Sequence, residues 1–351
     1  MARPTQASEA AAPGPGDAAD RLLAMIDGSW VTQAVYVAAE LRIADLLARG
    51  PMDSQALARA ASADAAALRR LLRALATVEV VRELDDGSFE LTPLGERLRD
   101  DHPESVRGWS VLIGGKQWPV WGNLLYSVRT GRSARSMLTG TEGFGHLDKD
   151  PEWAALFHRA MAEQTRLIAP AVVRAYDFSP FRRVADVGGG RGELLAHVLA
   201  ASPAATGVLF DLPAAVEEGR HHLERAGLAA RCEFIAGSFF ESVPPGADAY
   251  LLKSIIHDWD DPPARQILER CRAAMPPGAR LLLVERVQPD HPRATAADQA
   301  AARSDLNMLV ALAAKERTAV EFDALLRSAG FRLTRTVLAG RGHSVLEAVP
   351  F

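Results

Sequence analysis

Polar side chains able to move a proton follow apolar runs in the C-terminal half of the chain. His257 comes after the run Ala249–Leu252, and Glu285 comes directly after Leu281–Val284. Histidine accepts protons near neutral pH, and a carboxylate behind it fixes its tautomer and orientation. Glu285 and the more distant Glu316 can each supply that carboxylate. An isolated histidine at a strand end is usually just an exposed loop residue. Because acids that could orient it accompany His257, we expect it to be a general base.

A metal site is an alternative for the same stretch, because His257, Asp258, Asp260 and Asp261 are all potential ligands. Asp260 and Asp261 stand just before two prolines, where an acid is typical of a helix N-cap. The pattern favours the helix start, so we expect no metal ion.

A glycine-rich stretch follows another apolar run, Val184–Val187, which carries Asp186. Glycines directly after a strand favour a turn that lets a ligand approach the backbone, although they also suit a tight strand–helix junction. The dinucleotide fingerprint would need a glycine where Glu193 stands. The remaining pattern is acid-x-Gly-x-Gly-x-Gly, formed by Asp186, Gly188, Gly190 and Gly192.

From residue 181 onward, apolar strands alternate with helical segments, which predicts a doubly wound parallel sheet over 181–351. Ligands of such sheets lie beyond the carboxyl ends of the strands. Asp211 ends the second strand, where an acid can accept ribose hydroxyls or cap the following helix. Ser238 and Phe239 follow the third strand and offer a hydroxyl and an aromatic face. The strands are expected at 183–187, 206–210, 231–236, 248–252, 280–285, 331–337 and 343–349.

The N-terminal part divides into three segments. Residues 1–19 are small, polar and rich in Pro and Gly, which predicts a disordered tail. Residues 20–102 combine helical patterns, N-cap acids at Asp53 and Asp64, and an Asp-Gly turn between two short strands, which is typical of a winged helix. Residues 103–180 are mostly helical and link this domain to the sheet.

A winged helix also suggests DNA binding, with arginines of its second helix as contacts. Residues 53–99, however, carry seven arginines against eight acids, whereas a DNA surface is distinctly basic. We expect this domain to pack against the catalytic domain and a second copy of itself. The candidate DNA contacts are Arg69, Arg70 and Arg73.

The helical link is rich in aromatic residues, which usually fill a core but can also form the walls of a pocket for a planar ring. The candidate pocket residues are Trp118, Trp121, Phe157 and Met161, with Met308 further along the chain.

Composition limits the kinds of partner and the cellular location that we expect. The net charge of −4 gives no electrostatic reason for a nucleic-acid or membrane partner, and two cysteines exclude a disulfide scaffold. The N-terminus lacks the apolar core of a signal peptide, and we see no apolar run long enough to span a bilayer. We expect a soluble, cytoplasmic protein. The Ala- and Pro-rich stretch 290–303 is expected to be a loop.

Taken together, these motifs resemble the S-adenosylmethionine-dependent O-methyltransferases of small molecules, both the plant caffeic-acid type and the bacterial antibiotic-pathway members acting on mitomycins, anthracyclines and phenazines. The resemblance covers nearly the whole chain. The segments that carry it are Asp186–Gly190, Phe210–Pro213, Gly237–Phe240, Leu252–Trp259 and Lys315–Thr318.

The resemblance implies an intertwined homodimer, S-adenosylmethionine as cofactor, His257 as base, and methylation of a phenolic or enolic hydroxyl on an aromatic secondary metabolite. It implies cofactor contacts from Gly188, Asp211, Ser238, Phe239 and Lys253, besides Asp186 and Gly190 of the glycine turn. Relatives that retain the cofactor for hydroxylation or decarboxylation are an alternative. A regulator using the winged helix is a third, disfavoured by its charge.

Two positions depart from the family pattern. Many relatives have an acid where this chain has Ser238, and many have two glycines where it has Ala313 and Ala314.

Overall fold

The computed structural model describes residues 15–351, which form two compact units divided between His102 and Pro103. Most of the tail expected over 1–19 lies outside the described residues. Its last residues, from Pro15, belong instead to the first helix, α1 (Pro15–Glu40). Proline at the first helical position needs no N–H partner, and Asp17 in the first turn complements the helix dipole, so the helix begins earlier than expected.

The first unit has the expected winged-helix pattern. The Asp53 carboxylate accepts the N–H groups of Gln55 and Ala56, and that of Asp64 accepts the N–H of Ala67, so both expected N-caps are confirmed. Its elements after α1 are α2 (Ile43–Leu47), α3 (Ser54–Ala60), α4 (Ala65–Ala76) and the antiparallel pair β1 (Val81–Glu83) and β2 (Phe89–Leu91).

Helix α1 exposes several large apolar side chains along its length. By length and composition alone, Asp17–Glu40 meets the requirement for a membrane span, as core helices of soluble proteins also do. The expectation that no apolar run is long enough to span a bilayer is therefore corrected. This run was missed in the sequence because a few charged residues interrupt the apolar residues of α1. Its exposed large apolar side chains are Leu22, Leu23, Met25, Ile26, Trp30 and Val31.

The second unit opens with the helical segment expected before the sheet. Glu163 on the long helix α9 (Pro151–Ala175) accepts the N–H groups of Gly108 and Trp109, which ties the start of α5 to α9. The helices before α9 are α5 (Arg107–Val111), a π-helical turn (Leu112–Lys116), α6 (Trp118–Gly122), α7 (Leu124–Thr130) and α8 (Ala134–Thr139).

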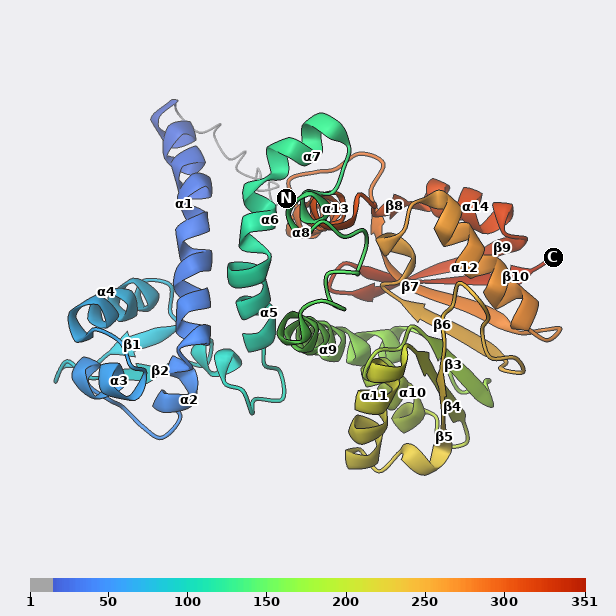
Figure 1. Ribbon diagram of the computed structural model, residues 1–351, viewed down its shortest axis with the longest axis horizontal. Helices are drawn as coiled ribbons and strands as arrows, with labels where there is room; N and C mark the ends of the chain where they lie inside the picture. Colours follow the sequence, from blue (N-terminus) through green and yellow to red (C-terminus); the bar gives the residue numbers. More distant parts are fainter. Residues whose placement is uncertain (1–14) are drawn as a thin grey trace, which may run out of the picture. The chain divides into compact units, whose positions relative to one another are not determined.

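The sheet confirms the doubly wound α/β fold (Figure 1). Its strand order is β5-β4-β3-β6-β7-β10-β9, with the first five strands parallel and the β9–β10 hairpin antiparallel. Because β3 lies between β4 and β6, the order reverses beside it, and ligands of such sheets bind at that point. The strands are β3 (Arg183–Val187), β4 (Thr206–Asp211), β5 (Cys232–Ala236), β6 (Ala249–Lys253), β7 (Arg280–Gln288), β9 (Phe331–Gly340) and β10 (His343–Pro350).

Helices cover both faces of this sheet, so its central strands are buried on both sides (Figure 1). Along β3, Ala185 and Val187 join one apolar cluster with Ile267 of α12, whereas Val184 joins another with Leu195 of α10. The helices of this region are α10 (Glu193–Ala201), α11 (Pro213–Arg225), α12 (Asp261–Ala274), α13 (Ala296–Leu312) and α14 (Ala319–Ser328).

One local expectation is corrected, and one short strand is additional to those expected. The loop expected over 290–303 ends early, because the Thr295 hydroxyl caps α13 and the alanine-rich stretch then continues as helix. A two-residue strand, β8 (Arg317–Thr318), pairs with the extended end of β7 and was not expected, since two residues are too short for a periodic pattern.

Candidate active site

The glycine turn after β3 needs glycine for two physical reasons. Gly188, Gly190 and Gly192 have φ of +70°, +56° and +73°, a left-handed conformation that other residues rarely adopt. A Cβ on Gly188 would also lie 2.5 Å from Cδ1 of Ile255, and one on Gly189 would lie 2.7 Å from Cγ of Asp186. The turn therefore brings bare backbone against the ends of β3 and β6.

This turn forms one wall of a cavity of about 380 Å³ at the carboxyl ends of the strands. Helix α9 forms another wall, where the expected pocket residues Phe157 and Met161 lie. All seven residues expected to contact the cofactor line the cavity: Asp186, Gly188, Gly190, Asp211, Ser238, Phe239 and Lys253.

Two acids of the cavity have different surroundings. Asp211 accepts the N–H groups of Gly190 and Leu212, both at 2.7 Å, and so fixes the glycine turn. It does not cap α11, whose N-cap is Leu212. Asp186 is buried, and its Oδ2 has no hydrogen-bond partner. Burial, assisted by the Asp211 charge, raises the pKa of Asp186 to about 7.

Lys253, at the end of β6, donates from Nζ to Oγ1 of Thr165 at 3.1 Å. Burial lowers the pKa of this lysine to about 8, against the opposing influence of nearby carboxylates. Ser238, which replaces the acid of many relatives, accepts the N–H of Phe240 at 3.3 Å and still lines the cavity.

These residues fit S-adenosylmethionine, a cationic ligand with ribose and adenine parts. The unpartnered oxygen of Asp186 is suited to a positive charge, and the space beside the Cα of Gly190 is open, with no atom within 4 Å of where a Cβ would stand. Phe239 offers an aromatic face in the same cavity.

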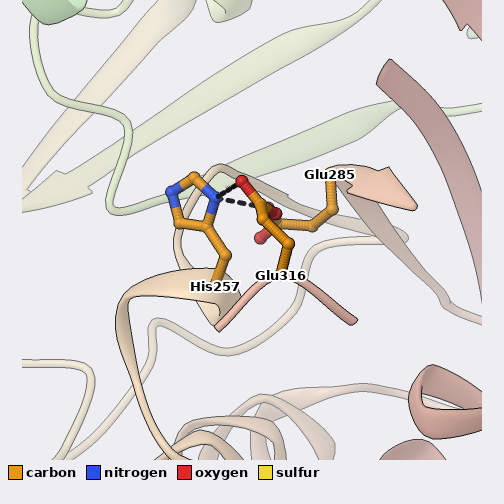
Figure 2. Close-up of side chains that lie close together, drawn as sticks. All are labelled: His257, Glu285 and Glu316. Carbon is orange, nitrogen blue, oxygen red and sulfur yellow. Dashed lines mark hydrogen bonds and ion pairs between the residues drawn. The ribbon is translucent and has the colours of Figure 1, made fainter. Parts of the chain in front are cut away.

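Next to this cavity, His257 lies among three carboxylates, those of Glu285 and Glu316 on its Nδ1 side (Figure 2) and that of Asp258 near Nε2. Its Nδ1 is 3.1 Å from Oε1 of Glu316 and 3.5 Å from Oε2 of Glu285. Its Nε2 is 3.4 Å from Oδ1 of Asp258, which lines the cavity. The fold thus brings together the three residues expected to form the base, from the 3₁₀ turn Ile256–Asp258, from β7, and from the segment before β8.

Backbone and side-chain contacts hold the two glutamates in place. Oε1 of Glu285 accepts the N–H groups of Ile255 and Ile256, at 3.0 and 2.8 Å. Oε1 of Glu316 accepts the Ser304 hydroxyl at 2.6 Å, and its own N–H donates to Asp305. The carboxylates are therefore positioned before any ligand arrives.

Alanine replaces glycine just before Glu316, yet the chain keeps a glycine-like shape there. Ala313 ends α13 with φ of +54°, the left-handed conformation common at helix C-termini. Holding alanine in this conformation costs about 1 kcal/mol.

The carboxylates make His257 an unusually strong base. Burial by itself disfavours the imidazolium ion, but the charges of Glu285, Asp258 and Glu316 outweigh burial and raise the pKa of His257 to about 10. Burial raises the pKa of Glu285 to about 7 and that of Asp258 to about 6, while His257 holds the pKa of Glu316 below its usual value despite burial.

Metal-ligand geometry occurs within this same cluster. Among the described residues, His257, Glu285 and Glu316 place ligand atoms within 4.8 Å of one another. Of the other candidate ligands, Asp261 pairs with Arg317 at 2.7 Å, and Asp260 is the N-cap residue of α12, without a side-chain bond to the helix. The absence of a metal ion stays a prediction.

Three expected pocket residues lie outside the lining of the cavity. Trp121 donates from Nε1 to Oδ1 of Asn307 at 3.0 Å, Met308 is buried on α13, and Trp118 is 39% exposed. Spacing on the helical segment did not reveal which aromatic residues face the cavity, because that depends on how the helices pack.

Sequence reasoning missed several residues of the cavity wall. Asp258 was considered only as a metal ligand, although its position beside His257 was a usable signal. Trp259 ends the motif Leu252–Trp259, but the sequence suggested no role for it. Its ring packs edge-on against that of Phe240, with ring centroids 4.7 Å apart. Other lining residues without an assigned role are Phe144, Leu147, His158 and Thr165.

Comparison with known proteins gives family matches in both units of the chain. The family model of the O-methyltransferase domain matches residues 121–332, and that of the O-methyltransferase dimerisation domain matches residues 23–101. A phenazine O-methyltransferase of Lysobacter antibioticus is 43% identical over 94% of this chain and 95% of its own length.

Solved structures show the same likeness. The mitomycin 7-O-methyltransferase structure has a TM-score of 0.87 at 38% identity, covering 96% of this chain and 98% of its own. An O-methyltransferase from neocarzinostatin biosynthesis, in complex with S-adenosylmethionine and 2-hydroxy-5-methyl naphthoic acid, has a TM-score of 0.78 at 33% identity, covering 92% and 96%. The chain therefore belongs to the family of S-adenosylmethionine-dependent O-methyltransferases of small molecules.

Proposed function

We propose that this enzyme methylates a phenolic or enolic hydroxyl of an aromatic secondary metabolite, with His257 as the general base. The observation that carries the proposal is the ring of carboxylates around His257, which borders a cavity suited to S-adenosylmethionine. Phe157, Met161 and Trp259 supply apolar walls for a planar acceptor.

Asp186, Asp211, Ser238, Phe239 and Lys253 would hold the cofactor. When bound, S-adenosylmethionine supplies an electrophilic methyl group for in-line displacement. Asp211 has lone pairs free to accept ribose hydroxyls besides its two backbone bonds, and Asp186 can face a positive charge. Phe239 offers a stacking surface to adenine, and the backbone of the glycine turn gives close approach.

His257 would take the proton of the acceptor hydroxyl at Nε2. In the neutral form of the ring, a hydrogen bond from Nδ1 to Glu316 would leave the lone pair on Nε2, the nitrogen on the side of Asp258, which lines the cavity. A pKa of about 10 matches that of an ordinary phenol, so the proton passes between groups of similar affinity. Glu285 and Glu316 act as positioning residues that stabilise the imidazolium ion formed.

Product analysis tests this function. The enzyme is incubated with S-adenosylmethionine and a panel of hydroxylated aromatics, and S-adenosylhomocysteine and the methyl ether are measured together. A cofactor-retaining relative would instead yield an oxygenated or decarboxylated product without S-adenosylhomocysteine. Formation of no S-adenosylhomocysteine from any acceptor contradicts methylation.

A homodimer is part of the proposal. The dimerisation-domain match and the exposed apolar side chains of α1 both support it, since a second copy would cover that surface. The alternative of a DNA-binding regulator is weakened further, because Glu83 pairs with Arg69 at 2.7 Å and with Arg73 at 3.6 Å. A cytoplasmic location remains part of the proposal.

A further inference from the structure

Helix α13 carries a serine that bonds to a carboxylate beside the proposed base. The Ser304 hydroxyl donates to Oε1 of Glu316 at 2.6 Å, a short distance that is typical of a hydroxyl on an ionised carboxylate. The same oxygen lies 3.1 Å from Nδ1 of His257 (Figure 2). One atom of Glu316 therefore contacts both a hydroxyl from α13 and the ring that is to take up a proton.

The other oxygen of Glu316 lacks such support. Oε2 is buried without a hydrogen-bond partner. Despite burial, the charge of His257, its contact with Oε1 and the hydrogen bond from Ser304 hold the pKa of Glu316 below its usual value. Without the hydroxyl, His257 alone would orient the carboxylate, whose terminal torsion is soft and would then allow it to turn.

Two further contacts fix the helix and the glutamate relative to each other. Nε2 of Gln288, at the end of β7, donates to the carbonyl oxygen of Ala301 at 2.8 Å, which ties α13 to the strand that carries Glu285. The N–H of Glu316 donates to Oδ1 of Asp305, the residue after the serine, at 2.9 Å. The hydroxyl thus comes from a rigid element whose place in the site is set by other bonds.

Helix formation does not explain a serine at this position. Helix α13 is rich in alanine, and alanine is a better helix former than serine. A serine inside a helix often bonds to the carbonyl group four residues earlier, whereas the hydroxyl of Ser304 reaches across to Glu316. The side chain therefore serves the cluster around His257 rather than the helix.

We propose that Ser304 is a positioning residue for methyl transfer, which holds Oε1 of Glu316 against Nδ1 of His257. The inference rests on the proposed function, because it needs His257 as the base. With Nδ1 held at Glu316, Nε2 stays on the side of Asp258, which lines the cavity. Ser304 is not among the lining residues, so it should affect the rate of the reaction and not the binding of either substrate.

Rate and binding measurements on Ser304 variants test this role, with an acceptor that the wild type methylates. In single turnover, Ser304→Ala should methylate about tenfold more slowly, because a hydrogen bond to a charged group is lost. The KM for the acceptor and the affinity for S-adenosylhomocysteine should stay unchanged. Ser304→Thr keeps a hydroxyl and should recover most of the rate. The matched control is Ser328→Ala, which removes a helix hydroxyl that donates to a backbone carbonyl at 2.7 Å and should react at the wild-type rate.

A double variant shows whether Ser304 acts through Glu316. Once Glu316→Ala has removed the carboxylate, Ser304→Ala has nothing to position and should slow the reaction no further. Equal factors of loss in the two backgrounds would show that the serine acts independently of Glu316, which overturns the proposal. A wild-type rate in Ser304→Ala overturns it as well, and so does a Ser304→Thr variant that is as slow as Ser304→Ala.

Thermal unfolding and the wild-type reaction separate the remaining outcomes. Because alanine favours the helix, Ser304→Ala should have a Tm close to that of the wild type. A large fall in its Tm would mean that the serine serves the fold, which contradicts the proposal. If the wild type methylates no acceptor, the proposed function itself is rejected, whereas a wild type that methylates no faster than Ser304→Ala overturns only the role of Ser304.

Discussion

At the scale of single residues, base strength at His257 is set by the charges around it. Burial alone would make the ring a weak base, yet three neighbouring carboxylates reverse that effect. The raised pKa keeps His257 protonated at neutral pH in the absence of substrate. The rate of a step that needs the neutral ring should therefore rise with pH, about tenfold per unit, until pH approaches the pKa.

His257→Ala should lower kcat sharply, by about a hundredfold or more, because it removes the proton acceptor. The affinity for S-adenosylhomocysteine should change little, since the residues expected to hold the cofactor line the cavity and His257 is not among the lining residues. His291→Ala, at an exposed histidine, is the matched control. A variant that retains the wild-type rate would reject His257 as the base.

Glu316→Gln separates orientation from charge. The amide can still accept the hydrogen bond from Nδ1 of His257, but it no longer favours the imidazolium ion. The pKa of His257 should fall, so the rising limb of the kcat/KM profile should move about one unit toward lower pH. Glu241→Gln, which neutralises an exposed acid, should leave the limb in place. An unmoved limb in Glu316→Gln would show that this carboxylate does not set the base strength.

The raised pKa of Asp186 predicts pH-dependent binding of the cofactor. Below about 7 this carboxyl is largely protonated and neutral; above it, the carboxylate favours a cationic ligand. Affinity for S-adenosylmethionine should therefore increase as pH rises through 7, with release of a proton. Calorimetry in buffers of different ionisation enthalpy measures this. The affinity of Asp186→Asn for S-adenosylmethionine should not depend on pH in this way. An equally steep pH profile in that variant would assign the dependence to another titrating group.

At the scale of elements, the glycine turn shows how local shape serves the cavity. Gly188→Ala places a methyl group against Ile255 in a left-handed backbone. Affinity for S-adenosylhomocysteine should fall about tenfold or more, and stability by more than the roughly 1 kcal/mol of the backbone strain alone.

Gly227→Ala is the matched control, because Gly227 has φ of +71° but a Cβ added there would meet no atom within 4 Å, and the residue lies outside the cavity. It should lose stability without losing affinity. Equal affinity losses in the two variants would mean that the contact with Ile255 is unimportant.

Most strands and helices could be predicted from local sequence patterns. All seven expected strands are present within a few residues, since fully buried strands are continuous apolar runs bounded by turn residues. The helix propensity of the alanine-rich stretch and the N-cap at Thr295 explain why α13 begins inside the loop expected over 290–303. The register of β8 on β7 depends on a long-range contact that no local pattern contains.

At the scale of the whole molecule, association of two chains should depend on α1. A Leu23→Glu and Ile26→Glu double variant puts charges among side chains that are 55% and 58% exposed in the single chain. Light scattering should show a dimer for the wild type and a monomer for the variant, because burying these carboxylates is unfavourable. Val320→Glu, at an exposed apolar residue of α14, should remain dimeric. A double variant that stays dimeric would place the interface elsewhere.

The sequence by itself determined the fold class, the winged-helix pattern and the glycine turn, and it pointed to Glu285 beside His257, because strand ends in a doubly wound sheet converge on one edge. Only the tertiary structure decided which side chains face the cavity. It moved Trp118, Trp121 and Met308 out of its lining and brought Asp258 into it. It also buried Arg135 of α8 with its Nε and Nη1 lacking hydrogen-bond partners, since the pairing of a buried charge depends on neighbours distant in sequence, which spacing along the chain does not specify.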